Sequence, residues 1–187
     1  MDTAGLLTTL AGAARGSTFG LVALALLTGC TSLASGGPTA VAPSEVAPDG
    51  PGAAVMVEVI DGDTIDVSIQ GRIERIRLIG IDTPETKRPN TPIECFGPEA
   101  TAFTESLLPV GTPIRIERDT VGRDDFGRLL GYVYRADDGI FVNYEIVRQG
   151  FATPLTIRPN DTFETLFVDA ATRAERDDVG LWSACAG

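Results

Sequence analysis

In the stretch VMVEVIDGDTIDVSIQGRIERIRLIGIDTPE, residues 55–85, three runs rich in β-branched residues are separated by two short turn signals. Within the second and third runs, apolar and polar side chains alternate, which is typical of strands with one buried face. The turn signals are Asp61-Gly62 and Gln70-Gly71. The stretch therefore predicts three strands joined by tight turns, over residues 55–60, 65–69 and 72–81.

The rest of the folded part reads as a helix, two strands and further helices. A helix is expected to begin at Gly97, with Pro98 in its first turn, and strands are expected over 113–118 and 129–135. A short helix is expected over 141–149. Asp161 with Glu164 resembles a capping box, so a last helix should start there and end at Gly180. This order predicts an α+β, mainly β fold, a five-stranded OB-fold barrel with three packed helices.

The composition excludes several kinds of site and leaves two interpretations of the charge. The 187 residues contain no histidine, which excludes the Ser-His-Asp triad, the Cys-His pair and most catalytic zinc sites. The formal net charge is −11, and Lys87 is the single lysine. Proteins that bind polyanions normally have a basic face. Either the acidic surface is a solvation adaptation around a locally positive site, or the ligand is not a polyanion.

The N-terminal segment has the pattern of an export signal. The apolar run 19–27 is too short to span a bilayer as a helix, but it suits the core of a signal peptide. It ends in LTGC (27–30), which resembles the lipobox of prokaryotic lipoproteins, with Cys30 as the lipidated residue. The alternative is an ordinary signal peptide with a chance cysteine. We predict a signal peptide ending in a lipobox over 1–29, a flexible tether over 30–52 and a folded domain over 53–187.

This organisation predicts an exported protein, either a lipoprotein of the cell membrane that faces outside, held by its lipid anchor, or a secreted protein. Cys95 and Cys185 are the two other cysteines. In an exported protein, two such cysteines are more often bridged than free, so we expect a disulfide between them. The alternative is two separate buried thiols.

Acidic residues at the ends of the expected strands suggest a metal site. Asp63 lies at the start of one strand and Asp82 at the end of the next, so a hairpin would return both carboxylates to the same end of the sheet. Calcium prefers carboxylate and carbonyl oxygens in a flexible geometry. Asp63, Asp82 and the Thr83 carbonyl could therefore bind Ca²⁺. The alternative for the Asp-Gly-Asp sequence is a plain hairpin turn.

Two arginines accompany these acids. Arg77 lies five residues before Asp82, on the strand face opposite Ile76 and Leu78, and Arg128 opens a later strand. A guanidinium group binds phosphate through two parallel hydrogen bonds and stays charged at any working pH. Each arginine alone could be a surface ion-pair partner. Together with the acids, they indicate a site that stabilises the charge developing on a phosphodiester under attack.

Seven short segments, spread over the folded part of the chain, occur in a characteristic order. They are VIDGDT (59–64), RLIGIDTPETK (77–87), FGPEA (96–100), DFGR (125–128), VN (142–143), VRQG (147–150) and LWS (181–183). They closely resemble the staphylococcal nuclease (thermonuclease) family, and the match covers essentially the whole folded domain. The resemblance implies an SNase-like OB-fold with three helices and calcium-dependent hydrolysis of DNA and RNA. It also implies cleavage of the 5′ P–O bond, which leaves 3′-phosphates.

By position, the resemblance assigns the same three oxygen ligands to calcium. It implies that Glu85 holds or deprotonates the attacking water, and that Arg77 and Arg128 grip the scissile phosphate. A proton-donating role for Arg128 is chemically unattractive, because guanidinium does not readily give up a proton.

The chain departs from the family in the substrate groove. Phe126 stands where the family has a tyrosine whose hydroxyl touches phosphate, and Asp125 replaces a lysine. The paired tyrosines that stack on the bound base are replaced around Leu155 and Ile157. Because stacking is worth about 1–3 kcal/mol per base, these changes predict weaker or differently biased substrate binding.

These observations favour an exported, metal-dependent nuclease that acts on nucleic acid as a monomer. The main alternative is a catalytically inactive nuclease-fold binding module at the cell surface. A third interpretation, a structural calcium-binding domain, would not need Arg77 and Arg128.

Overall fold

The computed structural model describes residues 53–89 and 91–185 of the chain. The predicted signal peptide, the lipobox with Cys30 and the tether lie outside these residues. In the described part, no helix has both the length and the apolar character needed to cross a membrane.

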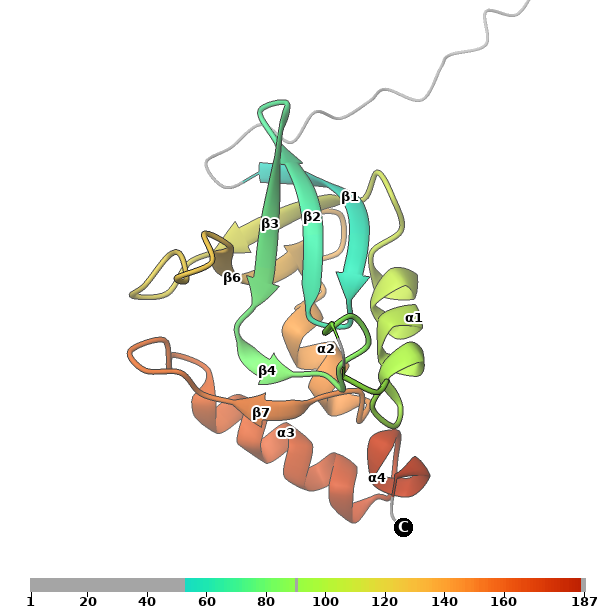
Figure 1. Ribbon diagram of the computed structural model, residues 1–187. Helices are drawn as coiled ribbons and strands as arrows, with labels where there is room; N and C mark the ends of the chain where they lie inside the picture. Colours follow the sequence, from blue (N-terminus) through green and yellow to red (C-terminus); the bar gives the residue numbers. More distant parts are fainter. Residues whose placement is uncertain (1–52, 90, 186–187) are drawn as a thin grey trace, which may run out of the picture. The chain divides into compact units, whose positions relative to one another are not determined.

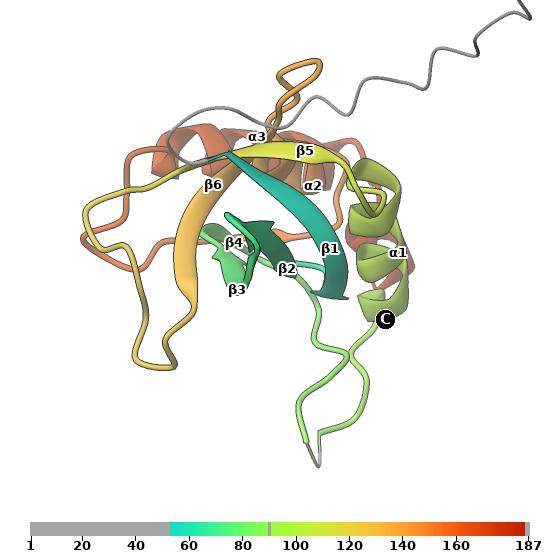
Figure 2. The same cartoon turned by 90° about the horizontal axis from the view of Figure 1, so that it is seen from above.

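Five strands close into a barrel (Figures 1 and 2), which confirms the predicted OB-fold. The strands of the barrel are β1 (Ala53–Asp61), β2 (Thr64–Ile69), β3 (Arg72–Leu78), β5 (Pro113–Glu117) and β6 (Leu129–Arg135). Their order around the barrel is β1-β2-β3-β6-β5. All pairings are antiparallel except that of β3 with β6. The alternate apolar residues of the meander point inward, and Ile65, Val67, Ile76 and Leu78 are fully buried.

The prediction of one strand over 72–81 is wrong, because the strand is broken at its end. β3 stops at Leu78, and β4 (Gly80–Asp82) then pairs with β7 (Thr153–Leu155), a strand that the sequence analysis missed. Gly80 has a φ of 82°, and a Cβ there would collide with the Phe167 ring. Only glycine fits this turn. Asp82 is therefore delivered by a separate two-stranded sheet rather than by the hairpin.

Two helices pack on the barrel, a third packs on one of them and on the small sheet, and a fourth adds one turn at the C-terminal end (Figure 1). They are α1 (Gly97–Leu107), α2 (Val142–Arg148), α3 (Glu164–Arg176) and α4 (Leu181–Ala184). α1 packs beside β1, and α2 packs against β6 and α3. α3 in turn lies under β7 in Figure 1, so it supports the small sheet from below.

Both predicted ends of the last helix are wrong. Phe163 is its N-cap residue and has no side-chain atom that could cap the helix, and the Asp161 carboxylate, which was expected to form a capping box, is paired with Arg158. The helix stops at Arg176, and Gly180 is the residue that precedes α4. Gly150 and Gly180 approach so closely that a Cβ on either would overlap the backbone of the other segment. This contact and the hydrogen bond from Leu181 N to Gly150 O (2.8 Å) fix α4 against the end of α2.

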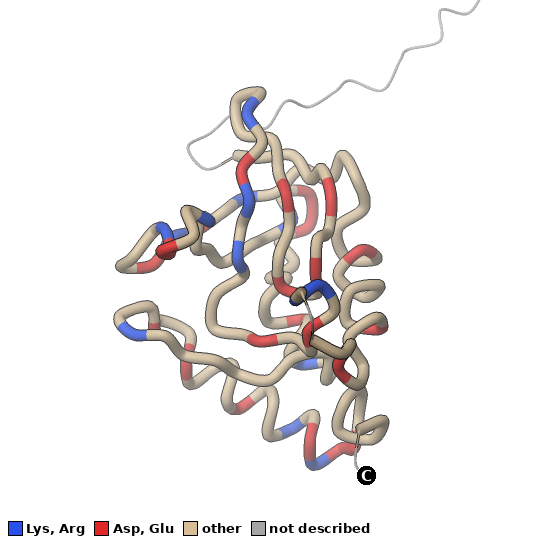
Figure 3. Tube along the Cα trace, viewed as in Figure 1, with Lys and Arg blue, Asp and Glu red and all other residues tan. Residues whose placement is uncertain are grey.

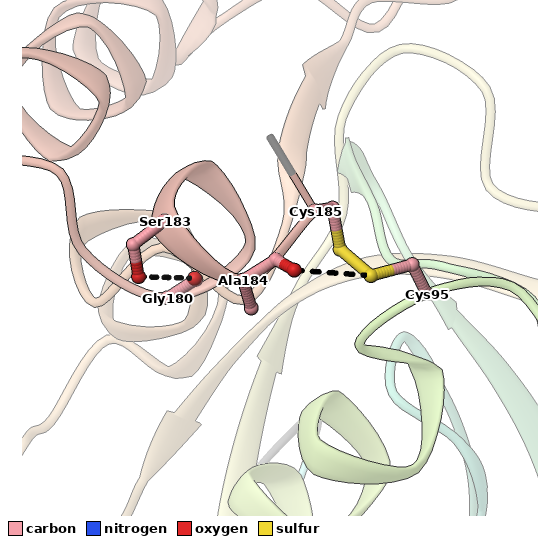
Figure 4. The surroundings of a disulfide bond; sticks show 5 residues. All are labelled: Cys95, Gly180, Ser183, Ala184 and Cys185. Carbon is pink, nitrogen blue, oxygen red and sulfur yellow. Dashed lines mark hydrogen bonds between the residues drawn. A yellow bond between two sulfur atoms is a disulfide. The ribbon is translucent and has the colours of Figure 1, made fainter. Parts of the chain in front are cut away.

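Cys95 and Cys185 are joined by a disulfide (Figure 4). It links the segment before α1 to the end of α4, and the two cysteines are 90 residues apart in the chain. Cross-links that close long loops restrict the unfolded chain most. The disulfide therefore ties the C-terminal turn to the barrel side of the fold.

We expect replacement of both cysteines, in Cys95→Ser/Cys185→Ser, to lower the free energy of unfolding by about 4.6 kcal/mol, the chain-entropy value for a loop of 90 residues. Urea denaturation of the oxidised protein and of the double variant measures the difference. Dithiothreitol should destabilise the native protein by a similar amount and leave the double variant unchanged. Equal stability of all forms would contradict the prediction.

Candidate active site

A hollow of about 650 Å³ lies at the end of the barrel where the β1–β2 turn, β3 and β4 meet. All six residues that the sequence analysis assigned to catalysis or to metal binding line it: Arg77, Glu85, Arg128, Asp63, Asp82 and Thr83. They come from segments that lie up to 65 residues apart in the chain, so only the folded barrel brings them together.

Strand register places Arg77 between the two predicted acidic ligands. Thr64 pairs with Arg77 in the β2–β3 ladder, which puts Asp63, one residue earlier, beside the guanidinium. Nη2 of Arg77 donates a hydrogen bond to Asp82 (2.8 Å), and Nη1 lies against the Asp63 carboxylate. Nη1 is buried and completes no hydrogen bond of normal geometry among the described residues. Both terminal nitrogens of Arg77 thus face a carboxylate.

Hydrogen bonds hold both the backbone and the side chain of Asp63 in place. Its backbone carbonyl accepts a hydrogen bond from Leu78 N (2.8 Å), and its carboxylate accepts bonds from the amide (3.0 Å) and the hydroxyl (3.1 Å) of Thr83. With 6% of its surface exposed, Asp63 is buried. The three oxygen-bearing residues Asp63, Asp82 and Thr83 are therefore held next to one another.

The oxygen atoms of these three residues are ligands of the kind that a hard cation prefers. Within the part of the chain that the structure describes, no three His, Cys, Asp or Glu side chains form a group able to hold a metal ion. The site instead offers two carboxylates and a backbone carbonyl. Calcium accepts such oxygen ligands and completes its coordination with water or substrate oxygens, so the residues present fit calcium and leave room for a phosphate oxygen.

Glu85 lies in a loop that several hydrogen bonds hold in place. Its backbone exchanges two bonds with Glu94, from Glu85 N to Oε2 (2.9 Å) and from Glu94 N to Glu85 O (3.0 Å). Its carboxylate accepts bonds from the amides of Lys87 (2.8 Å) and Arg88 (3.1 Å). Burial acts to raise the pKa of Glu85, but these amides and the Asp61 side chain bring it below the ordinary value. Glu85 is therefore ionised at neutral pH.

Asp61 behaves in the opposite way. Burial, followed by its contact with Glu85, raises the pKa of Asp61. The carboxylate also accepts a hydrogen bond from the Thr86 hydroxyl (2.9 Å), which anchors the Glu85 loop to the end of β1. Asp61 belongs to the Asp-Gly-Asp motif, but the sequence analysis treated it only as part of a turn signal and gave it no role in the site. The sequence feature that could have identified Asp61 as a site residue is its position in that motif, two residues before the predicted metal ligand Asp63.

Arg128 is oriented by Asp124, which the sequence analysis also missed. The Asp124 carboxylate accepts bonds from the backbone amide (2.9 Å) and the Nε (2.7 Å) of Arg128. Because β3 and β6 are parallel, with Ile76 paired to Leu129, Arg128 lies level with Arg75, two residues before Arg77 on β3. The sequence alone does not show which of Asp124 and Asp125 contacts Arg128, because the conformation of the turn decides it.

A second hollow of about 350 Å³ adjoins the first and has an apolar wall. The two hollows share Arg77, Phe126 and Arg128. Leu155 and Ile157, at the positions where the sequence departs from the family's stacking tyrosines, line the second hollow. The groove is therefore present, but its wall is aliphatic.

Charges of both signs surround these hollows. Figure 3 shows basic positions along β3, with acidic positions on β1 and β2 next to them. Arg75 pairs with Asp66 (2.7 Å), and Arg123 pairs with Glu74 (2.9 Å). The positive charges of the basic side chains around the hollows are thus largely neutralised by nearby carboxylates.

Comparison with known proteins identifies relatives for this arrangement. The family model described as "Staphylococcal nuclease homologue" matches residues 75–184. Thermonuclease of Staphylococcus intermedius is 39% identical over 124 residues, which cover 66% of this chain and 72% of that protein. Thermonuclease of Staphylococcus hyicus is 36% identical over 128 residues, 68% of this chain and 74% of that protein. Endonuclease YncB of Bacillus subtilis is 35% identical over 126 residues, 66% of this chain and 58% of that protein.

Proposed function

Because this chain belongs to the staphylococcal nuclease family and is a nuclease, we propose that it is calcium-dependent and hydrolyses DNA, RNA or both at the 5′ P–O bond, leaving 3′-phosphates. The observation that carries this proposal is the convergence of two carboxylates, a carbonyl, Glu85 and two arginines on one hollow. An inactive binding module, the alternative considered from the sequence, would not need this full set.

Asp63, Asp82 and the Thr83 carbonyl would hold the calcium ion. When bound, the ion supplies positive charge next to a phosphate oxygen and the attacking water. The two carboxylates are already brought together by one guanidinium, so little rearrangement separates their positions from a shared cation.

The arginines bind and stabilise the phosphate. Arg77 lines the hollow between the two acids, where its guanidinium would face a phosphate oxygen. Asp124 holds Arg128 through its Nε, which keeps the guanidinium oriented and leaves its terminal nitrogens available to the substrate. Two oriented guanidinium groups that face the equatorial phosphate oxygens stabilise the transition state most, because negative charge grows on these oxygens during attack.

Glu85 accepts a hydrogen bond from the attacking water and orients it. Its lowered pKa keeps it an acceptor at neutral pH, whereas burial and the contact with Glu85 shift the pKa of Asp61 in the opposite direction. The exchanged backbone bonds with Glu94 keep the loop from drifting away from the hollow. Fixed orientation of a reactant accounts for much of the rate that a positioned group provides.

Export and lipid anchoring complete the proposal and rest on the sequence of residues 1–30 alone. We expect cells that express the full chain to incorporate radioactive palmitate into it, because a lipobox cysteine receives acyl chains. Cys30→Ala should abolish the incorporation, whereas Cys95→Ser should leave it intact. Labelling of both variants would contradict the lipobox assignment.

We expect activity on single-stranded DNA to require calcium and to be lost in EGTA. Magnesium should substitute poorly, because it demands a tighter octahedron and sheds water reluctantly. Asp63→Asn should remove calcium binding in titration calorimetry while the far-ultraviolet circular dichroism stays native. Asp169→Asn, an exposed carboxylate on α3, is the charge-matched control. Full turnover in EGTA would overturn the metal assignment.

We expect Arg77→Lys and Arg128→Lys each to lower kcat by roughly 10²–10³-fold and to raise KM much less. One ammonium group cannot reproduce the two-pronged contact, and that contact is strongest in the transition state. Steady-state kinetics with saturating calcium separate the two constants. Arg173→Lys, on the exposed face of α3, should keep both. A near-normal kcat for Arg128→Lys would remove that residue from the clamp.

We expect kcat/KM on single-stranded DNA to stay flat or to rise as NaCl increases from about 0.02 to 0.2 M at fixed calcium. A net charge of −11 repels a polyanion at long range, and salt screens that repulsion over a Debye length of about 10 Å at 0.1 M. Proteins with a basic binding face instead weaken steeply with salt through counterion release. A steep monotonic fall would mean that a basic groove dominates binding.

A further inference from the structure

Phe126 is an exposed aromatic side chain beside the catalytic hollow. Its exposed fraction is 85%, the highest of the large apolar side chains in the described residues. Burying a phenylalanine is worth about 1.5–3 kcal/mol relative to leaving it in water. A ring left so open gives no folding stability at this position, which suggests that it contacts a ligand.

The turn that presents Phe126 is held rigidly. The Asp124 carboxylate accepts a hydrogen bond from Phe126 N (3.1 Å), and the Asp124 carbonyl accepts one from Gly127 N (3.0 Å). Arg123 donates to the Gly127 carbonyl (2.6 Å) and is itself paired with Glu74 on β3 (2.9 Å). Gly127 has a φ of 81°, a conformation that glycine adopts without strain. The ring therefore projects from a pre-organised turn, so a ligand that contacts it need not order a loop.

The ring lies where three hollows meet. It lines the catalytic hollow, the apolar hollow with Leu155 and Ile157, and a third hollow of about 430 Å³ formed with Ile73 and Arg75. The centre of the Arg128 guanidinium is 5.5 Å from the ring centroid. A flat group placed on this ring would therefore be next to a phosphate held by Arg128.

Charge alone provides little affinity for a nucleic acid here. The residues that line the three hollows include seven basic and eight acidic side chains. The arginines among them are paired with carboxylates, as in Arg75 with Asp66 and Arg128 with Asp124. A non-ionic contact would add to the affinity for a flexible strand, since stacking of a base on an aromatic ring is worth about 1–3 kcal/mol.

We propose that Phe126 is a stacking platform for one unpaired nucleobase, that of a nucleotide adjoining the phosphate held by Arg77 and Arg128. The proposal rests on the proposed function and adds to it a residue that contacts the base next to the scissile phosphate. Bases in a duplex are already stacked and paired, so a ring at the rim of the site reaches one only after costly extrusion. Phe126 thus supplies the π-face that the aliphatic positions Leu155 and Ile157 lack.

The test removes the base instead of the phosphate. Short single-stranded DNAs with one cleavable linkage carry an abasic residue on its 5′ side, on its 3′ side or nowhere. For the native enzyme with calcium, one of the two abasic substrates should lower kcat/KM about 5–150-fold, the equivalent of 1–3 kcal/mol. Phe126→Ala should cleave the intact DNA with a similarly reduced kcat/KM and show little further loss on the abasic one. Phe126→Trp should keep the abasic penalty.

Val110→Ala is the matched control, because Val110 is 79% exposed and lines none of the three hollows. It should show the native penalty. The same abasic penalty in Phe126→Ala and in the native enzyme would overturn the proposal, as would the absence of a penalty at both positions in the native enzyme. In either case, cleavage of the intact DNA would leave the nuclease function standing.

Binding measurements keep the test independent of catalysis. Fluorescence anisotropy with Glu85→Gln and calcium gives dissociation constants for the same DNAs, with and without Phe126→Ala. If no substrate were cleaved at all, the proposed function would fail, and these constants would still decide the stacking proposal. An abasic penalty in binding that disappears with Phe126 supports it, and an unchanged penalty overturns it.

Discussion

The contact of the Arg77 guanidinium with Asp63 and Asp82 is the interaction on which the site depends. The three residues come from the β1–β2 turn, β3 and β4, so the contact requires both the closed barrel and the small second sheet. Two carboxylates held this close repel each other unless a cation lies between them. Arg77 provides that positive charge in the structure, through its contacts with both carboxylates.

A single backbone constraint makes this contact possible. β3 runs in the barrel wall as far as Leu78, and a continued strand would carry Asp82 along the wall beyond the acidic turn. The positive φ of Gly80 redirects the chain, and the Phe167 ring of α3 fills the space that a side chain at residue 80 would occupy. α3 therefore contributes to the active site without touching it, because it supports the turn that positions Asp82.

The sequence predicted the barrel well because alternation and turn residues are local signals, and the family segments added the order of the site residues. It failed where contacts between distant segments decide the outcome. The break at Ile79, the strand β7 and the start of α3 each depend on partners that local periodicity does not reveal, such as the pairing of Asp161 with Arg158. The supporting acids Asp61 and Asp124 were missed for the same reason. Their importance lies in which group they face, and that is fixed only when the loops have folded.

The acidic surface and the paired arginines lead to one view of how this enzyme is selective. A groove with a strong positive potential would hold any nucleic acid, duplex or single strand, by its phosphates. Here the arginines are largely neutralised by neighbouring carboxylates, so a phosphate gains little until it lies in the clamp itself. Discrimination between duplex and single-stranded nucleic acid then depends on short-range contacts at one nucleotide and not on long-range attraction. In such a site an exposed ring on a rigid turn has more influence than several surface charges, because stacking depends on whether a base is free to leave its helix.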